Sequence, residues 1–143
     1  MKHLCLGVLT FLIFTFTASA AFAQSSETVS VNIGDSATLS KSKIAIKFIK
    51  VIEDSRCPVN VNCIWAGNAK IEVEISKGAK TETFTLNTNG QETSAKFSNY
   101  LVKFTDLKPE RSTDSAETKP DEKDKPCGVP YSASFVVEKF SGK

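Results

Sequence analysis

The sequence predicts an all-β domain, an antiparallel β-sandwich or small barrel of about seven to eight strands. Two observations support this fold class. Apolar residues alternate with polar ones in short runs over most of the chain, which is typical of strands with one buried face. Glycine, asparagine and proline separate these runs, and no segment sustains the apolar period of an amphipathic helix.

The first 23 residues have the form of a cleaved signal peptide. A short basic start precedes an apolar run over 4–17, and Ala21-Phe22-Ala23 has the small-x-small form of a signal peptidase site. The apolar run is shorter than the ~20 residues that a membrane-spanning helix needs. Cys5 lies too early to be the lipid-bearing first residue of a lipoprotein. We therefore expect an exported chain, periplasmic or extracellular, with no stable membrane anchor and a single β domain over 24–143.

The composition of the mature chain argues against several function classes. With Lys2 removed from the 18 basic residues, 17 remain against 16 acidic ones, so the net charge of +1 implies neither nucleic acid nor an anionic membrane as a partner. The only histidine, His3, leaves with the signal peptide. The usual general base and the commonest transition-metal ligand leave with it. We expect no enzymatic activity, no cofactor and no metal site.

The first predicted strands lie at 27–39 and 41–53. Gly34-Asp35 supplies a turn within the first run. In the second, the side chains expected to point inward are Ile44, Ile46 and Phe48. The alternation slips at 49–52, where either a bulge or a strand buried on both faces would fit.

The remainder of the chain continues the alternating pattern. The predicted elements are a hairpin of strands at 70–76 and 81–86, an Asn-Gly turn at 87–90, a weaker strand at 91–99, and strands at 101–107 and 131–140. The segment 109–126 holds no large apolar residue and mixes charges of both signs, so it cannot bury enough surface to offset the ordering of its backbone. We predict a disordered loop there, and a final strand that closes or crosses the sheet.

The stretch 53–68 is predicted to be a disulfide-pinned loop. Any two of the three mature cysteines could pair in an oxidising compartment. Cys57 with Cys63 is the favoured pair, because the two are near neighbours in a loop bent by Pro58. Closing so small a ring stabilises by about 2 kcal/mol in the chain-entropy model, so it would mainly fix the shape of the loop. Cys127 is then the candidate free thiol, either packed as a small apolar residue or available for an intermolecular bridge.

The candidate binding residues on this loop are Asp54, Arg56, Asn60, Asn62 and Trp65. Asp54 is expected to accept hydrogen bonds from nearby backbone N–H groups rather than to bind calcium. Arg56 either forms an ion pair with Asp54 or Glu53, or is displayed as a protease inhibitor displays an arginine. Trp65 is expected to lie over the disulfide as a lid on the core rather than to form an exposed binding platform.

The same stretch resembles a known signature. Asp54-Ser55-Arg56-Cys57-Pro58, then Val61, Cys63 and Trp65-Ala66-Gly67, is similar to the D-S-R-C-P-x-x-V-x-C-x-W-A-G pattern of a group of small secreted or lipoprotein-type bacterial proteins without established activity. The resemblance covers fourteen residues and implies an exported β domain. The chain departs from the lipidated members of that group because it lacks a lipobox.

These observations favour a secreted or periplasmic, non-enzymatic binding module with a disulfide-pinned loop. Its partner would be a protein or a small-molecule ligand of the cell envelope. Two alternatives stay open, a protease inhibitor presenting Arg56 and a thiol-mediated dimer formed through the unpaired cysteine.

Overall fold

The computed structural model describes residues 25–111 and 130–140. Eight β-strands and no helix make up this part of the chain. The predicted signal peptide, Cys127 and all but the first three residues of the predicted disordered loop lie outside the described residues. No candidate transmembrane helix occurs within the described ranges.

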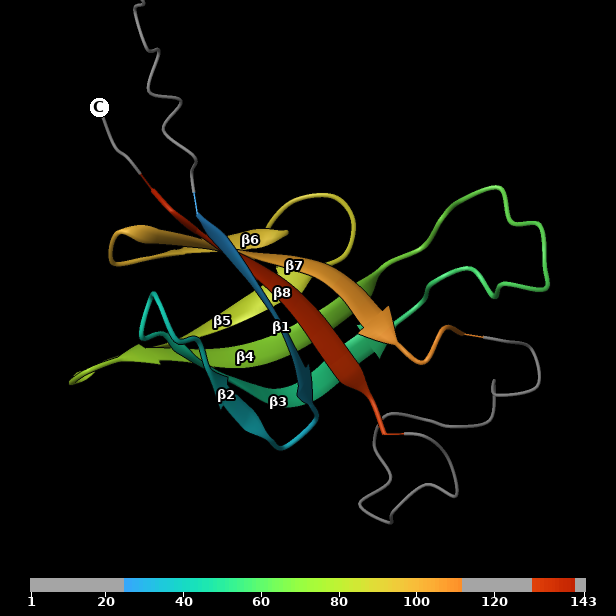
Figure 1. Ribbon diagram of the computed structural model, residues 1–143. Coiled ribbons are helices and arrows are strands. Elements are labelled where there is room, and N and C mark those ends of the chain that lie inside the picture. The colour runs from blue at the N-terminus through green and yellow to red at the C-terminus, as the bar shows by residue number, and fades with distance from the viewer. Residues whose placement is uncertain (1–24, 112–129, 141–143) are drawn as a thin grey trace, which may run out of the picture.

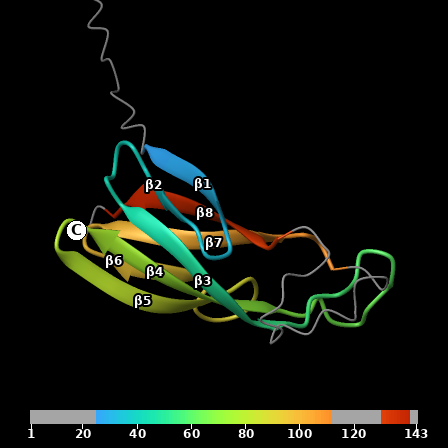
Figure 2. The ribbon, with the colours of Figure 1, turned by 90° about the horizontal axis from the view of Figure 1, so that it is seen from below.

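The strands form two antiparallel four-stranded sheets that pack face to face (Figures 1 and 2). Sheet A has the order β1 (Ser26–Asn32), β8 (Ser132–Lys139), β7 (Tyr100–Lys108), β6 (Ser94–Phe97). Sheet B has the order β2 (Ser36–Thr38), β3 (Ala45–Asp54), β4 (Ala69–Lys77), β5 (Lys80–Asn87). The all-β prediction and the number of strands are confirmed, and the described strands form a sandwich rather than a closed barrel.

A single cluster of buried apolar side chains fills the space between the sheets. Its bulkiest members without exposed surface are Phe48, Phe97 and Phe135. The three side chains predicted to point inward from the second run, Ile44, Ile46 and Phe48, are likewise fully buried. Burying a large apolar side chain contributes about 1.5–3 kcal/mol, so the alternation in the sequence reflects the main force that holds the sheets together.

The slip of alternation at 49–52 is a pair of β-bulges. The register of β3 against β4 shifts between Phe48 and Lys50 and again between Val51 and Glu53. Strand β3 has one extra residue at each shift. The side chain of Val51 therefore points back into the core and is 7% exposed, whereas Ile52 is 41% exposed. The bulge interpretation is therefore confirmed.

The predicted hairpin is also confirmed. Strands β4 and β5 pair up to Lys77 and Lys80, which leaves the two-residue turn Gly78-Ala79 with Gly78 at φ 60°. The final strand, β8, lies between β1 and β7 and is thus a central strand of sheet A. Strands β1 and β2, expected as one interrupted run, belong to different sheets, so the turn between them passes from one layer to the other.

Between β3 and β4 the chain leaves the sandwich and returns to it. This segment, 55–68, projects well beyond the ends of both strands in two perpendicular views (Figures 1 and 2). Every candidate binding residue from the sequence lies on it or, in the case of Asp54, at its start. We call residues 55–68 the pinned loop.

Candidate binding loop

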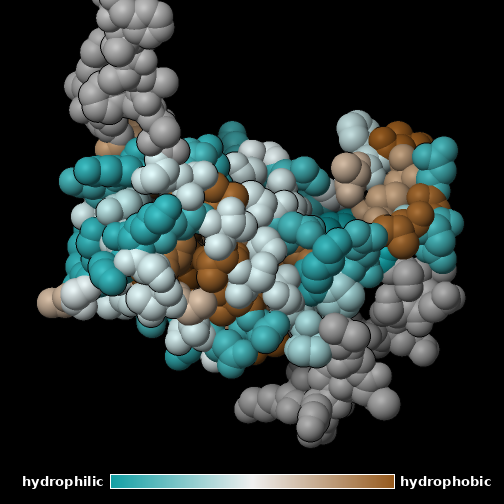
Figure 3. Space-filling model, viewed as in Figure 1, coloured by the Kyte–Doolittle hydropathy of each residue, from teal (hydrophilic) through white to brown (hydrophobic). Residues whose placement is uncertain are grey.

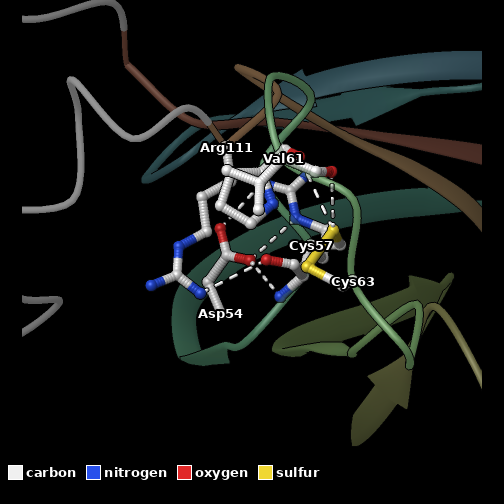
Figure 4. The surroundings of a disulfide bond; sticks show 7 residues. Asp54, Cys57, Val61, Cys63 and Arg111 are labelled. Atoms are coloured by element: carbon white, nitrogen blue, oxygen red, sulfur yellow. Dashed lines mark hydrogen bonds and ion pairs between the residues drawn. A yellow bond between two sulfur atoms is a disulfide. The ribbon is translucent and has the colours of Figure 1, made fainter.

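A disulfide joins the two legs of the pinned loop. Cys57 and Cys63 are bonded, with their α-carbons 6.0 Å apart (Figure 4), which confirms the favoured pairing. Such a bond fits an oxidising compartment. Backbone hydrogen bonds from Ser55 N to Asn68 O at 2.7 Å and from Cys57 N to Ala66 O at 2.9 Å continue the β3–β4 pairing outward. The legs are therefore held as a narrow extension of sheet B.

The close approach of the two legs depends on Gly67. This residue has φ 70°, and a Cβ atom added to it would lie 1.9 Å from the carbonyl oxygen of Ser55. Both the backbone conformation and the space admit glycine alone. The Ser55 hydroxyl donates to Asn68 O at 3.0 Å and accepts from Asn68 N at 3.3 Å, which closes the base of the loop.

Arg56 and Asp54 form a bidentate ion pair. Nε of Arg56 donates to Oδ1 of Asp54 and Nη2 donates to Oδ2, both at 2.7 Å. The two side chains are only 14% and 9% exposed. The Arg56 backbone N–H also donates to Asp54 Oδ1 at 3.3 Å, so both the expected ion pair and the expected backbone contact are present.

The guanidinium of Arg56 also reaches across to sheet A. It donates to the carbonyl of Leu107 near the end of β7 and, at 2.9 Å, to the carbonyl of Pro109. These contacts tie the pinned loop to the other layer of the sandwich. They also mean that Arg56 is not displayed at the surface as an inhibitory arginine would be.

The pKa values at this site follow from the ion pair. Partial burial of Asp54 acts to raise its pKa, but the hydrogen bonds and charge of Arg56 outweigh it and bring the pKa below the ordinary value. The hydrogen bonds to Asp54 raise the pKa of Arg56 against the opposing effect of burial. Tyr131, whose hydroxyl faces Asp54, has a raised pKa because of its own burial and the nearby carboxylate. All three groups are thereby held in their usual charge states at neutral pH.

Asn68 connects the pinned loop to the turn after β5. Its side chain donates to Asn87 Oδ1 at 2.9 Å and accepts from Thr88 Oγ1 at 3.2 Å and from Asn89 N at 3.1 Å. Asn89 Nδ2 in turn donates to the carbonyl of Gly67. The sequence shows the asparagine-rich stretches but not that they meet, so the role of Asn68 in linking the loop to this turn is not predictable from it.

Arg111 is a second site residue that the sequence did not reveal, since it falls in the predicted disordered loop. Its carbonyl accepts from Val59 N at 2.9 Å, and its Nη1 donates to the carbonyl of Arg56 at 3.2 Å (Figure 4). Arg56, Arg111, Asp106 and Glu110 are among the residues lining an open groove of about 310 Å³ beside the loop. The groove is therefore lined by two basic and two acidic side chains.

The outer end of the pinned loop is apolar and exposed. Val59 is 64% exposed, Val61 46%, Ile64 92% and Trp65 81%. We call these four residues the apolar tip. Figure 3 shows apolar groups along both the upper and the lower margin of the projecting loop. Asn60 and Asn62, also binding candidates, are exposed on the same segment.

The prediction that Trp65 covers the core is wrong. The hydrogen bond between Cys57 and Ala66 extends the strand pairing outward, so Trp65 lies beyond it on the projecting part of the loop. The core is already complete, because none of its buried residues lies between 52 and 68. The Trp65 ring is exposed instead, as in the alternative prediction for this residue.

Asp54 has no free face for a metal ion. Its Oδ2 is engaged by Arg56 at 2.7 Å and by the Tyr131 hydroxyl at 3.4 Å, and its Oδ1 by Arg56. Within the described residues, no three histidine, cysteine, aspartate or glutamate side chains are grouped as metal ligands would be. Both oxygens of the carboxylate are therefore engaged, and it acts as an anchor for Arg56.

Comparison with protein-family models, with curated proteins and with solved structures gives no match. The likeness of 54–67 to the secreted bacterial signature consequently stays a prediction.

Proposed function

We propose that this protein is an exported, non-enzymatic binding module of the bacterial envelope that contacts its partner through the apolar tip. The observation that carries the proposal is the exposure of Ile64 and Trp65, at 92% and 81%, on a loop whose backbone is held in place. Exposed apolar groups gathered in one place mark interaction sites. Aromatic residues such as tryptophan are enriched among the side chains that dominate binding energy.

The pinned loop is held in one conformation although it contributes no side chain to the core. Ordering a residue costs about 1–2 kcal/mol of backbone entropy, and the tip buries no core side chain in return. The disulfide, the Arg56–Asp54 pair and the contacts of Asn68 offset that cost. A loop ordered before binding loses less entropy when a partner arrives, which raises affinity. All of these contacts thus help to keep the tip in one conformation.

The geometry favours this function over the protease inhibitor presenting Arg56, whereas the thiol-mediated dimer stays an open alternative. To enter a protease specificity pocket, Arg56 would have to leave Asp54, Leu107 and Pro109. Dimerisation through a thiol would involve Cys127, which lies outside the described residues. Export is supported by the signal-peptide pattern and by a disulfide suited to an oxidising compartment.

Site-specific photo-crosslinking tests the proposal. A photoreactive residue replaces Ile64 in one variant and Lys47, exposed on β3 away from the loop, in the control. Each purified variant is irradiated with envelope fractions. We expect a crosslinked product, of protein or lipid, from position 64 alone. An excess of wild-type protein should suppress it, and an excess of Ile64→Ser should not.

Two results would contradict the proposal. One is the absence of any product at position 64 under conditions in which the photoreactive group is shown to react. The other is the same product at positions 64 and 47, which would indicate nonspecific contact.

A further inference from the structure

We propose that the partner of the apolar tip is a lipid bilayer surface, into whose interfacial layer the tip inserts reversibly. This inference rests on the proposed function, because it identifies what the tip contacts. The shape of the tip is the first reason. Val59 and Val61 lie on the leg before Cys63, whereas Ile64 and Trp65 follow it, so apolar groups occupy both legs (Figure 3).

A partner must therefore cover the tip from more than one side. A flat protein surface would cover one leg and leave the other in water. A bilayer surrounds whatever enters it, and the pinned loop projects far enough from the sandwich to enter first (Figures 1 and 2). The exposed fractions of Val59 on one leg, at 64%, and of Ile64 on the other, at 92%, show that neither leg is shielded by the rest of the described chain.

The charge distribution is the second reason. The eleven residues from Cys57 to Gly67 include no aspartate, glutamate, lysine or arginine, although charged residues make up 24% of the chain. Placing a charged side chain in a bilayer is costly, and this stretch avoids that cost. The charge next to this stretch along the chain, on Arg56, is neutralised by Asp54. Since the neighbouring groove is lined by equal numbers of basic and acidic groups, insertion should not depend on anionic lipid.

Hydrogen bonding within the loop is the third reason. Backbone groups that enter a layer poor in water need partners of their own. Val61 N donates to Pro58 O at 3.1 Å, Val59 N donates to Arg111 O and Cys57 N to Ala66 O, both at 2.9 Å. Tryptophan favours the interface between lipid headgroups and acyl chains, where its ring is buried and its N–H stays near polar groups.

Trp65 is the only tryptophan of the protein, which makes the test direct. The mature protein with its disulfide intact is titrated with phosphatidylcholine vesicles while tryptophan emission is recorded. We expect a shift of emission to shorter wavelength, and quenching by brominated acyl chains. Ile64→Ser should lower the vesicle partition coefficient about tenfold, because it removes one large apolar side chain from the inserted surface.

The matched control is Ile52→Ser, an exposed isoleucine on β3 outside the tip. It should leave the partition coefficient unchanged within about twofold. Adding anionic lipid or raising the salt concentration should also leave binding nearly unchanged, as expected for apolar insertion. Circular dichroism and thermal unfolding verify that each variant is folded.

An unchanged emission spectrum in the presence of vesicles would overturn the lipid proposal. So would binding that requires anionic lipid and disappears in salt, because that dependence would indicate attraction by surface lysines and arginines. The crosslinking experiment separates the two proposals. A protein product from position 64, together with no vesicle binding, refutes the lipid partner and leaves the proposed function intact. No product and no vesicle binding refute both.

Discussion

The hydroxyl of Tyr131 lies 3.4 Å from Oδ2 of Asp54, the oxygen that also accepts from Arg56 Nη2. Tyr131 immediately precedes β8 of sheet A, and Asp54 is the last residue of β3 of sheet B. One carboxylate therefore holds the pinned loop and joins the two layers of the sandwich. Its contacts lead to the first two predictions.

Replacing Asp54 with asparagine should lower the free energy of unfolding by about 2–3 kcal/mol. The change leaves the guanidinium of Arg56 largely buried without its counter-charge, and breaking a fully buried pair costs about 3–5 kcal/mol. Urea denaturation at neutral pH measures the loss. Glu72→Gln, which removes the exposed pair with Lys50, is the matched control and should cost under about 1 kcal/mol. Equal losses from both substitutions would show that Arg56 does not need the carboxylate.

The contribution of Asp54 should depend on pH in the acid range. Because its pKa is lower in the folded protein than its ordinary value of 3.8, the stabilisation is fully present above that value. It is lost as the pH falls through the lower pKa of the folded state. The difference in unfolding free energy between the wild type and Asp54→Asn should therefore shrink on acidification. A difference that stays constant from neutral pH to about pH 2 would contradict this assignment.

Gly67→Ala should destabilise the protein much more than Gly78→Ala. Both glycines have positive φ, so alanine carries a conformational cost of about 1–2 kcal/mol at either position. A Cβ at Gly67 would also collide with Ser55 O, whereas nothing lies within 4 Å of one at Gly78. Thermal unfolding of the two variants measures the contrast. Similar melting temperatures would show that the legs of the pinned loop can move apart freely.

Replacing both Cys57 and Cys63 with serine should leave the sandwich folded. The loss should be about 2 kcal/mol, because the disulfide closes a short ring and neither cysteine belongs to the core. Circular dichroism should be unchanged, and hydrogen exchange should quicken at the backbone N–H groups of position 57 and of Val61 within the loop. Global unfolding of the double variant would show that the disulfide supports the whole domain.

A substitution in the exposed tip should cost far less free energy of unfolding than a substitution in the buried core. Ile64→Ala should change the free energy of unfolding by under about 0.5 kcal/mol, because the side chain is 92% exposed. Phe48→Ala should cost about 3–5 kcal/mol, because it leaves a cavity between the sheets. Chemical denaturation compares the two. A large loss from Ile64→Ala would mean that the tip packs against other residues.

Local patterns in the sequence are sufficient to predict most of the strands. Ile71, Val73 and Ile75 alternate with charged residues, and all three are fully buried in β4. The disulfide was predictable for a similar reason, since Cys57 and Cys63 are close along the chain. In these cases a preference over a few residues agrees with the tertiary structure, so the pattern and the fold give the same answer.

The features missed by the sequence depend on contacts between distant segments. Arg111 meets the pinned loop across 55 positions from Arg56, and Asn68 meets Asn87 across 19. Neither contact produces a periodic pattern in the sequence. Trp65 was misplaced because apolar character usually indicates burial, and the sequence does not show that the disulfide holds this part of the loop away from the core. The residues of the apolar tip are exposed although apolar residues are usually buried, and the proposed function rests on them.

The central position of β8 affects how sheet A assembles. The sheet has the order β1, β8, β7, β6, so β1 and β7 have no partner on their facing edges until β8 lies between them. The pairing of β1 with β8 joins residues a hundred or more positions apart, which makes the sheet slow to assemble. Until β8 pairs with both neighbours, the facing edges of β1 and β7 stay open to pairing with other strands, so this one strand guards sheet A against mispairing.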